Sequence, residues 1–156
     1  MTMSEPSVST RAGQERLKER GVIPLPEPDE VSAPYWDAAQ NEELHLQHCS
    51  ACDTIRHPPS PDCPECGDSS SDWRRVSGKG TVYSFIVDHR LMVPGFDEPY
   101  VVAQINPVEA TRDTVRIVAN IKGCDTSEVF IGMPVEVYFE VRAGMTIPQF
   151  KQDTES

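Results

Sequence analysis

Four cysteines in two closely spaced pairs constrain this chain more than any other feature of its sequence. Cys49 and Cys52 form one C-x-x-C pair, and Cys63 and Cys66 form the second. Within such a pair, two thiolates and the backbone N–H groups of the turn can face one metal ion. Four thiolates leave no open position on a tetrahedral ion, which is typical of a structural zinc site rather than a catalytic one. The sequence therefore predicts a small lobe stabilised by one structural Zn²⁺ per chain.

Paired cysteines also form disulfides in many small secreted proteins. The N-terminal residues Met1–Glu5 lack the charged and apolar regions of a secretory signal. The two-residue spacing within each pair also favours metal binding. We therefore expect reduced thiolates and a cytoplasmic protein. No apolar run approaches the length of a helix that spans a bilayer, so no membrane partner is expected.

The charge balance restricts the classes of partner. The chain has 156 residues and a formal net charge of −11. Nucleic acids and anionic membranes attract cationic surfaces, so neither is an expected partner. Hydrophobic residues make up 38% of the chain, which is enough for a modest core. At this length we expect one domain or two small lobes.

The first part of the chain has the composition of an extension rather than of a domain. Residues 1–31 are largely polar and rich in proline near their end, which predicts a flexible arm, in part helical and in part extended. Residues 32–43 have the pattern of a short helix with Pro34 in its first turn. Tyr35 and Trp36 give this helix a large aromatic surface. That surface either packs on the chain's own core or belongs to an interface, where aromatic residues are enriched.

The rest of the chain predicts a mainly β structure. Residues 44–72 hold the two cysteine pairs and a leading strand, which predicts a zinc ribbon. Over residues 73–145, several short runs alternate apolar and polar residues as half-buried strands do. Asp125 and Glu128 have capping-box spacing, which predicts one helical turn before the last strand. We expect an OB-fold barrel over 73–145 and a C-terminal tail at 146–156, although periodicity alone also admits an SH3-like barrel or a small sandwich.

One connecting segment is unusually apolar. Leu91, Met92, Val93 and Phe96 occur together between two predicted strands, whereas loops normally lie at the surface and are polar. The loop either folds back over the end of the barrel or inserts into a partner or an acyl channel, because exposed apolar patches often mark such sites. These four residues and the aromatic helix are the candidate interface with a partner or with acyl-CoA.

No residue has the sequence context of a catalytic group. Cys124 is the one cysteine outside the two pairs and has no histidine near it in the sequence. A lone cysteine is more often a small buried hydrophobic residue. His48 and His57 flank the first pair, but four cysteines already complete a zinc site. We therefore predict that the chain has no catalytic residues.

In their order along the chain, these motifs resemble a known family of small bacterial and archaeal proteins. The family joins a rubredoxin-like zinc ribbon to an OB-fold and is described as acyl-CoA-associated. The similarity covers residues 32–142 and is carried by Pro34-Tyr35-Trp36, Leu44 before Cys49-x-x-Cys52, His57-Pro58-Pro59, Cys63-Pro64-Glu65-Cys66-Gly67, Ser77–Ser84, Pro99–Val102 and Gly132–Val137. Each segment alone is a weak signal, whereas the combination is specific.

The resemblance implies an accessory role beside an enzyme of the thiolase superfamily. Members of the family are companions of thiolases, 3-hydroxy-3-methylglutaryl-CoA synthases, sterol-carrier-type thiolases and side-chain aldolases. In such a hetero-oligomer the partner supplies the catalytic groups, while the small subunit stabilises it and helps to form its acyl-CoA site. One alternative is an OB-fold protein that binds single-stranded nucleic acid, which requires a basic groove with stacking aromatic residues. The other is a rubredoxin-like iron carrier.

Overall fold

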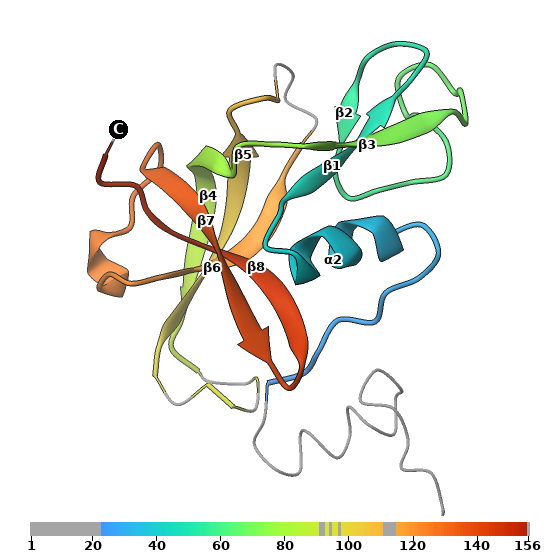
Figure 1. Ribbon diagram of the computed structural model, residues 1–156. Helices are drawn as coiled ribbons and strands as arrows, with labels where there is room; N and C mark the ends of the chain where they lie inside the picture. Colours follow the sequence, from blue (N-terminus) through green and yellow to red (C-terminus); the bar gives the residue numbers. More distant parts are fainter. Residues whose placement is uncertain (1–22, 91–92, 94, 97, 111–114, 156) are drawn as a thin grey trace, which may run out of the picture.

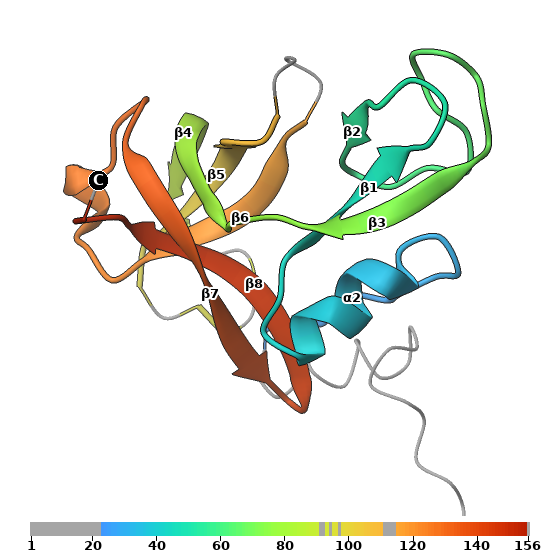
Figure 2. The ribbon, with the colours of Figure 1, turned by 45° about the horizontal axis from the view of Figure 1, so that its top comes forward.

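The described part of the chain is mainly β, as the sequence predicts, and combines a short α-helix, a small ribbon and a barrel (Figure 1). This computed structural model describes residues 23–90, 93, 95–96, 98–110 and 115–155. The ribbon and the barrel lie side by side in two views of the molecule, and the helix lies below the ribbon and next to the barrel (Figures 1 and 2).

The segment before the helix packs against the protein. Leu25 is buried, and the segment leads into α2 (Ala33–Gln40). Asp29 and Ser32 exchange side-chain-to-backbone hydrogen bonds at the turn, with lengths of 3.0 and 2.7 Å. The structure therefore differs from the prediction of a flexible extension over residues 1–31, since part of that extension is held by a buried leucine. Residues 1–22 of the predicted extension lie outside the described residues.

α2 connects the ribbon to the barrel. Tyr35 and two alanines of the helix are buried, and the helix packs beside the first strand of the ribbon and the last strand of the barrel. The Thr146 hydroxyl donates a hydrogen bond to Oε1 of Gln40 at 3.2 Å. Within the described residues, no helix has the length and apolar character that crossing a membrane requires.

The ribbon is a three-stranded antiparallel sheet with the strand order β2–β1–β3. Its strands are β1 (His45–Cys49), β2 (Ile55–Arg56) and β3 (Ser71–Arg75). The central strand β1 is mostly buried, whereas β3 is mostly exposed, so the sheet has little apolar core of its own. Buried hydrogen bonds also stabilise the sheet. Oε1 of the buried Gln47 accepts hydrogen bonds from Arg56 Nε at 2.8 Å and from Ser60 N at 2.9 Å.

Five of the described strands close into a barrel with the order β4–β5–β6–β8–β7. They are β4 (Lys79–Asp88), β5 (Tyr100–Pro107), β6 (Ile117–Lys122), β7 (Pro134–Arg142) and β8 (Met145–Gln152). β6 and β8 pair in parallel, the other neighbours pair antiparallel, and β4 meets β7 to complete the ring. A short 3₁₀ helix, η1 (Thr126–Glu128), lies between β6 and β7 at the predicted capping box. The predicted OB-fold is therefore confirmed, and the SH3-like and sandwich alternatives are excluded.

The last barrel strand corrects one prediction, because residues 145–152 form β8 where the sequence predicts a tail at 146–156. Pro148 conceals the strand, since proline cannot donate a ladder hydrogen bond and is unusual inside a sheet. In the structure Pro148 pairs with Phe139 of β7, and the parallel pairing with β6 starts further along, at Phe150. The proline therefore lies where β8 has a strand on one side and α2 near the other.

The inward side chains of the alternating strands fill the barrel. The largest fully buried strand residues include Val82, Ile105, Ile117, Val135 and Phe150, and Met133 joins them from just before β7. At Gly80 the backbone of β4 comes so close to β5 that an added Cβ atom would lie 2.4 Å from the carbonyl oxygen of Asn106. Glycine at this position allows the barrel to close next to the ribbon.

Candidate metal centre and partner surface

The four paired cysteines converge on one point. Their Sγ atoms all lie within 4.8 Å of one another. The Sγ atoms of Cys49 and Cys66 are 3.6 Å apart, as are those of Cys52 and Cys63. A tetrahedral zinc ion with Zn–S bonds of about 2.3 Å separates its sulfur ligands by about 3.8 Å. The cluster therefore has the size of a four-thiolate metal site, and all four predicted ligands belong to it.

Both cysteine turns use the same local backbone arrangement. Asp53 N donates a hydrogen bond to the Cys49 carbonyl at 3.0 Å, and Gly67 N donates to the Cys63 carbonyl at 2.9 Å. The residue that follows each pair has a positive φ, 64° at Asp53 and 78° at Gly67. Glycine adopts this conformation without the steric cost that a side chain brings. The sequence indicates this turn at Gly67, but it does not show that Asp53 adopts the same conformation.

Thr54 prepares Cys52 for metal binding. The Thr54 hydroxyl lies 3.1 Å from Cys52 Sγ. Hydrogen bonds from this hydroxyl and from the Thr54 backbone lower the pKa of Cys52 to about 6. The thiolate is the form of cysteine that binds metals. Because the donor set is four sulfurs in a closed arrangement, an ion bound by all four would have no free position for a substrate.

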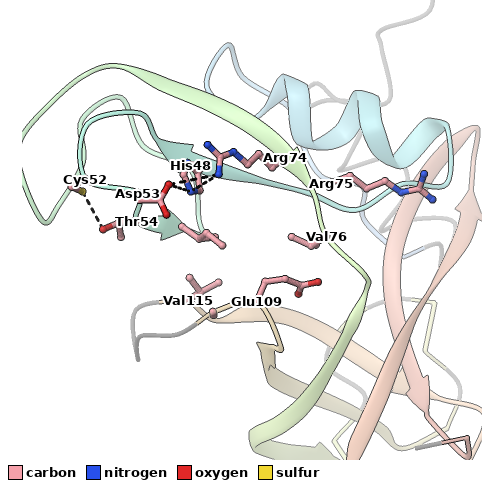
Figure 3. A pocket seen from close by; sticks show the side chains of 11 residues that line it. His48, Cys52, Asp53, Thr54, Arg74, Arg75, Val76, Glu109 and Val115 are labelled. Atoms are coloured by element: carbon pink, nitrogen blue, oxygen red, sulfur yellow. Dashed lines mark hydrogen bonds and ion pairs between the residues drawn. The ribbon is translucent and has the colours of Figure 1, made fainter.

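The buried imidazole of His48 joins the first cysteine turn to β3 (Figure 3). Its Nε2 atom lies 3.0 Å from an Asp53 carboxylate oxygen and 3.0 Å from Arg74 Nη1. An Asp72 carboxylate oxygen lies 3.4 Å from the imidazole Nδ1 and 3.4 Å from Arg74 Nε. The network fixes the residue after Cys52 to the far strand of the sheet. His48 therefore supports the metal site without being one of its ligands.

A pocket of about 480 Å³ separates this network from the barrel (Figure 3). Its ribbon side includes His48 and Arg74, and its barrel side includes Glu109 and Val115. Glu109 Oε1 accepts a hydrogen bond from Ser77 N at 2.6 Å, which attaches the end of the β5 turn to the segment between ribbon and barrel. The pocket thus lies at the junction of ribbon and barrel, where the Ser77–Glu109 hydrogen bond joins the connecting segment to the barrel.

The aromatic residues of α2 lie mainly inside the protein. Tyr35 is buried, and its ring centroid is 4.9 Å from that of Trp36 and 5.0 Å from that of His57. Burial raises the pKa of the Tyr35 hydroxyl, and burial lowers the pKa of His57 to about 4. Trp36 is partly buried and packs against the same core. Tyr35 therefore belongs to the chain's own core and is not a surface anchor, while Trp36 keeps some exposed surface.

The apolar loop is described only in part. Leu91 and Met92 lie outside the described residues, whereas Val93 and Phe96 are half-buried. The Phe96 ring stacks on Tyr100, with ring centroids 3.7 Å apart and an angle of 18° between the planes. The Tyr100 hydroxyl donates a hydrogen bond to Asp88 at 2.9 Å. Phe96 is thus attached to the end of the β4–β5 pair, and its role in an interface stays a prediction.

The outer surface of β4, β5 and β6 carries exposed apolar residues that the sequence pattern does not single out. Ile86 and Val118 are each 63% exposed, and Tyr83 is also exposed. A signal was present in the sequence, because Val118 stands between Arg116 and Asn120 at positions where a solvated strand face has polar residues. The alternation of apolar and polar residues does not distinguish an ordinary outward-facing valine from one that a partner covers.

The cysteine ribbon and the closed barrel together define a zinc-ribbon–OB-fold protein. Family models match two consecutive segments, described as the "ChsH2, rubredoxin-like zinc ribbon domain" over residues 36–72 and the "ChsH2, C-terminal OB-fold domain" over residues 73–140. A solved structure described as "Ltp2-ChsH2(DUF35) aldolase" contains a similar chain, 39% identical with a TM-score of 0.74. That match covers 82% of this chain and 98% of the other. The protein belongs to the ChsH2/DUF35 family.

Two curated relatives are matched over only part of their length. A probable enoyl-CoA hydratase alpha subunit of Thermomonospora curvata is 38% identical over 139 residues, which are 88% of this chain and 42% of the relative. A DUF35 domain-containing scaffold protein of Methanocaldococcus jannaschii is 36% identical over 94 residues, which are 58% of this chain and 63% of the relative. This chain therefore spans less than two thirds of the length of either protein.

Proposed function

We propose that this protein is a non-catalytic scaffold subunit that binds and stabilises an enzyme of the thiolase superfamily. The observation that carries the proposal is the match to 98% of a chain in the structure described as an Ltp2-ChsH2 aldolase, at 39% identity. The relative named a scaffold protein supports the same role. Thiolases, sterol-carrier-type thiolases and side-chain aldolases are the candidate partners, with acyl-CoA bound at the shared interface.

A hydratase complex is the second class of assembly. One curated relative is named an enoyl-CoA hydratase alpha subunit, and the match covers 42% of its length. We assign the activity in that name to the part of the relative that has no counterpart here. In both classes the enzyme acts on an acyl-CoA, and this chain contributes no catalytic group.

The described residues support a non-catalytic role. Burial and the nearby carboxylates of Glu128 and Asp125 raise the pKa of the Cys124 thiol. A nucleophilic cysteine needs the opposite shift, because the thiolate is the reactive form. The paired cysteines form a closed donor set, which leaves no position for a substrate on the metal.

The scaffold includes one structural Zn²⁺ held by Cys49, Cys52, Cys63 and Cys66. The sulfur–sulfur distances and the match to a zinc ribbon domain support this assignment. We expect about one zinc per chain in protein purified without a chelator. A red protein with a ferric thiolate absorption band, or a protein without zinc, would contradict it.

Charge disfavours the alternative in which the barrel binds single-stranded nucleic acid. The chain has a net charge of −11. Two lysines on the barrel wall are already paired with carboxylates, Lys122 with Glu140 at 3.1 Å and Lys151 with Glu136 at 3.5 Å. These pairs neutralise cations that a phosphate backbone would require.

Affinity purification of the tagged, zinc-loaded chain from its native host tests the proposal. We expect a thiolase-superfamily subunit in stoichiometric amount, identified by mass spectrometry and retained through gel filtration. The complex should turn over acyl-CoA, whereas the isolated chain should not. Recovery of no such enzyme, or turnover by the pure chain, would refute the scaffold role.

A further inference from the structure

We infer that the enzyme subunit docks on the outer surface of β4, β5 and β6, which we call the barrel face. The barrel face consists of Tyr83, Ile86, Val102, Gln104 and Val118. This inference rests on the proposed scaffold function, and it specifies which surface of the chain the partner covers.

Strand pairing brings three apolar side chains of the barrel face together. Ile86 pairs with Val102, and Gln104, two residues further along β5, pairs with Val118. Side chains that are paired or diagonal on one face of a sheet lie within reach of one another. Ile86 and Val118 are largely exposed and Val102 is half-buried. The part of the chain that the structure describes therefore leaves this apolar cluster open to a partner.

The barrel face is hollowed near its centre. A groove of about 260 Å³ is lined by Ser84, Ile86, Val102, Gln104 and Val118, together with parts of two inward residues. None of the lining residues is charged. Because a closed barrel offers no strand edge for pairing, a partner must bind here through side chains. Interface energy concentrates where an anchoring side chain fills such a pocket.

The surface continues beyond the groove at both ends. Tyr100 precedes Val102 by two residues on β5 and carries the stacked ring of Phe96. On the other side, the guanidinium carbon of Arg116 lies 3.8 Å from the centroid of the Tyr83 ring. The described surface therefore has an aromatic ring at each end, Tyr83 at one and the stacked Phe96–Tyr100 pair at the other. Such aromatic and arginine side chains are enriched at interfaces.

Charge favours an enzyme subunit over the other occupants. Two copies of a chain with a net charge of −11 repel each other, and the uncharged groove supplies no ion pair to offset that repulsion. A nucleic acid would need cations along the groove, and its lining has none. The complementary partner is a protein that places apolar side chains in the groove.

Two valines that differ in position but not in chemistry provide the test. Val118, on the barrel face, is 63% exposed, and Val108, in the turn after β5, is 61% exposed. Val118→Asp and Val108→Asp are prepared as full-length, zinc-loaded chains. Their affinity is measured by biolayer interferometry for two probes, the Ltp2 subunit of the solved relative and the thiolase-superfamily enzyme recovered from the native host.

We expect Val118→Asp to weaken binding by about thirtyfold or more, because a charge then occupies an apolar interface. Val108→Asp should leave the affinity within about twofold, as surface substitutions outside an interface do. Ile86→Ser serves as a second variant of the barrel face. Circular dichroism and zinc content are compared first, so that a loss of binding is not a loss of fold.

Unchanged binding by Val118→Asp and Ile86→Ser, or a loss confined to Val108→Asp, would overturn the docking face and leave the scaffold proposal intact. A homodimer that Val118→Asp dissociates would overturn it as well, and so would salt-dependent binding of single-stranded DNA that this variant abolishes. If the wild-type chain binds neither enzyme, the scaffold proposal falls and the docking face falls with it.

Discussion

The ribbon and the barrel become ordered by different means. The ribbon has short strands, and four of the five residues of β3 are exposed, so there is little apolar surface to bury. Its four cysteines instead meet at one point. The barrel buries the inward residues of five described strands in a shared core. Leu46 of the ribbon joins the same core, and Ile55 and Trp73 pack against it. The ribbon therefore combines this contact with metal–thiolate bonds, whereas the barrel depends on the hydrophobic effect alone. Substitutions that affect one part and spare the other test this division.

Loss of one metal ligand should have the largest effect. Cys63→Ser removes one of the four thiolates, and a structural zinc contributes about 10–16 kcal/mol of apparent binding free energy. We expect zinc content to fall close to zero and ribbon amides to exchange rapidly with solvent, while barrel amides stay protected. Metal analysis and hydrogen–deuterium exchange measure both effects. Loss of protection throughout the barrel would show that the two parts are not separately stabilised.

A cavity in the barrel core should lower the stability of the barrel and leave zinc binding unchanged. Ile105 is fully buried, and Ile105→Ala is expected to lower the free energy of unfolding by about 2–5 kcal/mol. Zinc content should not change, because the ligands are remote from this core. Urea denaturation with metal analysis provides the measurement. The control is Ile131→Ala, at an isoleucine that is 69% exposed, with an expected change below about 0.5 kcal/mol.

The free energy of unfolding should depend on pH through His57, which lies at the junction between the two parts. Burial lowers the pKa of His57 from 6.5 to about 4, so the unfolded chain binds this proton first as the pH falls. The associated stability is complete above about pH 6.5 and is lost progressively towards pH 4, by up to about 3 kcal/mol. In His57→Asn this contribution should be absent. Urea denaturation of both proteins at pH 7.5 and pH 5 isolates it, since the cysteines are unchanged; equal pH slopes would contradict the assignment.

The smallest expected effect concerns backbone conformation in the ribbon. Gly67 has a φ of +78° and nothing within 4 Å of an added Cβ atom, so Gly67→Ala introduces conformational strain of about 1 kcal/mol without a clash. Zinc affinity should fall by about fivefold. Gly132→Ala is the matched control, because Gly132 has a φ of +89°, equal free space and a position in a barrel turn. Its penalty should appear in barrel stability, and competition with a chromophoric chelator should show unchanged zinc affinity.

The local parts of this structure could be predicted from the sequence. Two C-x-x-C pairs specify a metal site through spacing alone, and the four cysteines do converge. Alternating runs indicate β4 to β7, and the capping box of Asp125 and Glu128 is present, with Glu128 Oε2 accepting from Asp125 N at 2.7 Å and Asp125 Oδ1 accepting from Ser127 N at 2.9 Å. In each case the residues that determine the structure are close together in the chain.

The features that depend on distant contacts could not be predicted. β8 contains Pro148, and only the barrel's strand pairing shows that this proline has a paired strand on one side and none on the other. Tyr35 is of a residue type that is enriched at interfaces, yet the ring of His57 and the core cover it. Val118 fits an alternating strand whether or not a partner binds over it. Periodicity determines which side of a strand a residue faces, but not what lies against that side.

Because β8 is a late segment of the chain, the ribbon can fold earlier during synthesis than the barrel. The ribbon sheet uses strands between residues 45 and 75, so it can bind its metal as soon as that segment has left the ribosome. The barrel waits for residues 145–152, since β8 lies between β6 and β7. Until that strand arrives, β6 has one unpaired edge, and such edges recruit strands from other chains. A nascent chain therefore carries a metal-bound ribbon beside an open sheet, and β8 covers the free edges of both β6 and β7 when it arrives.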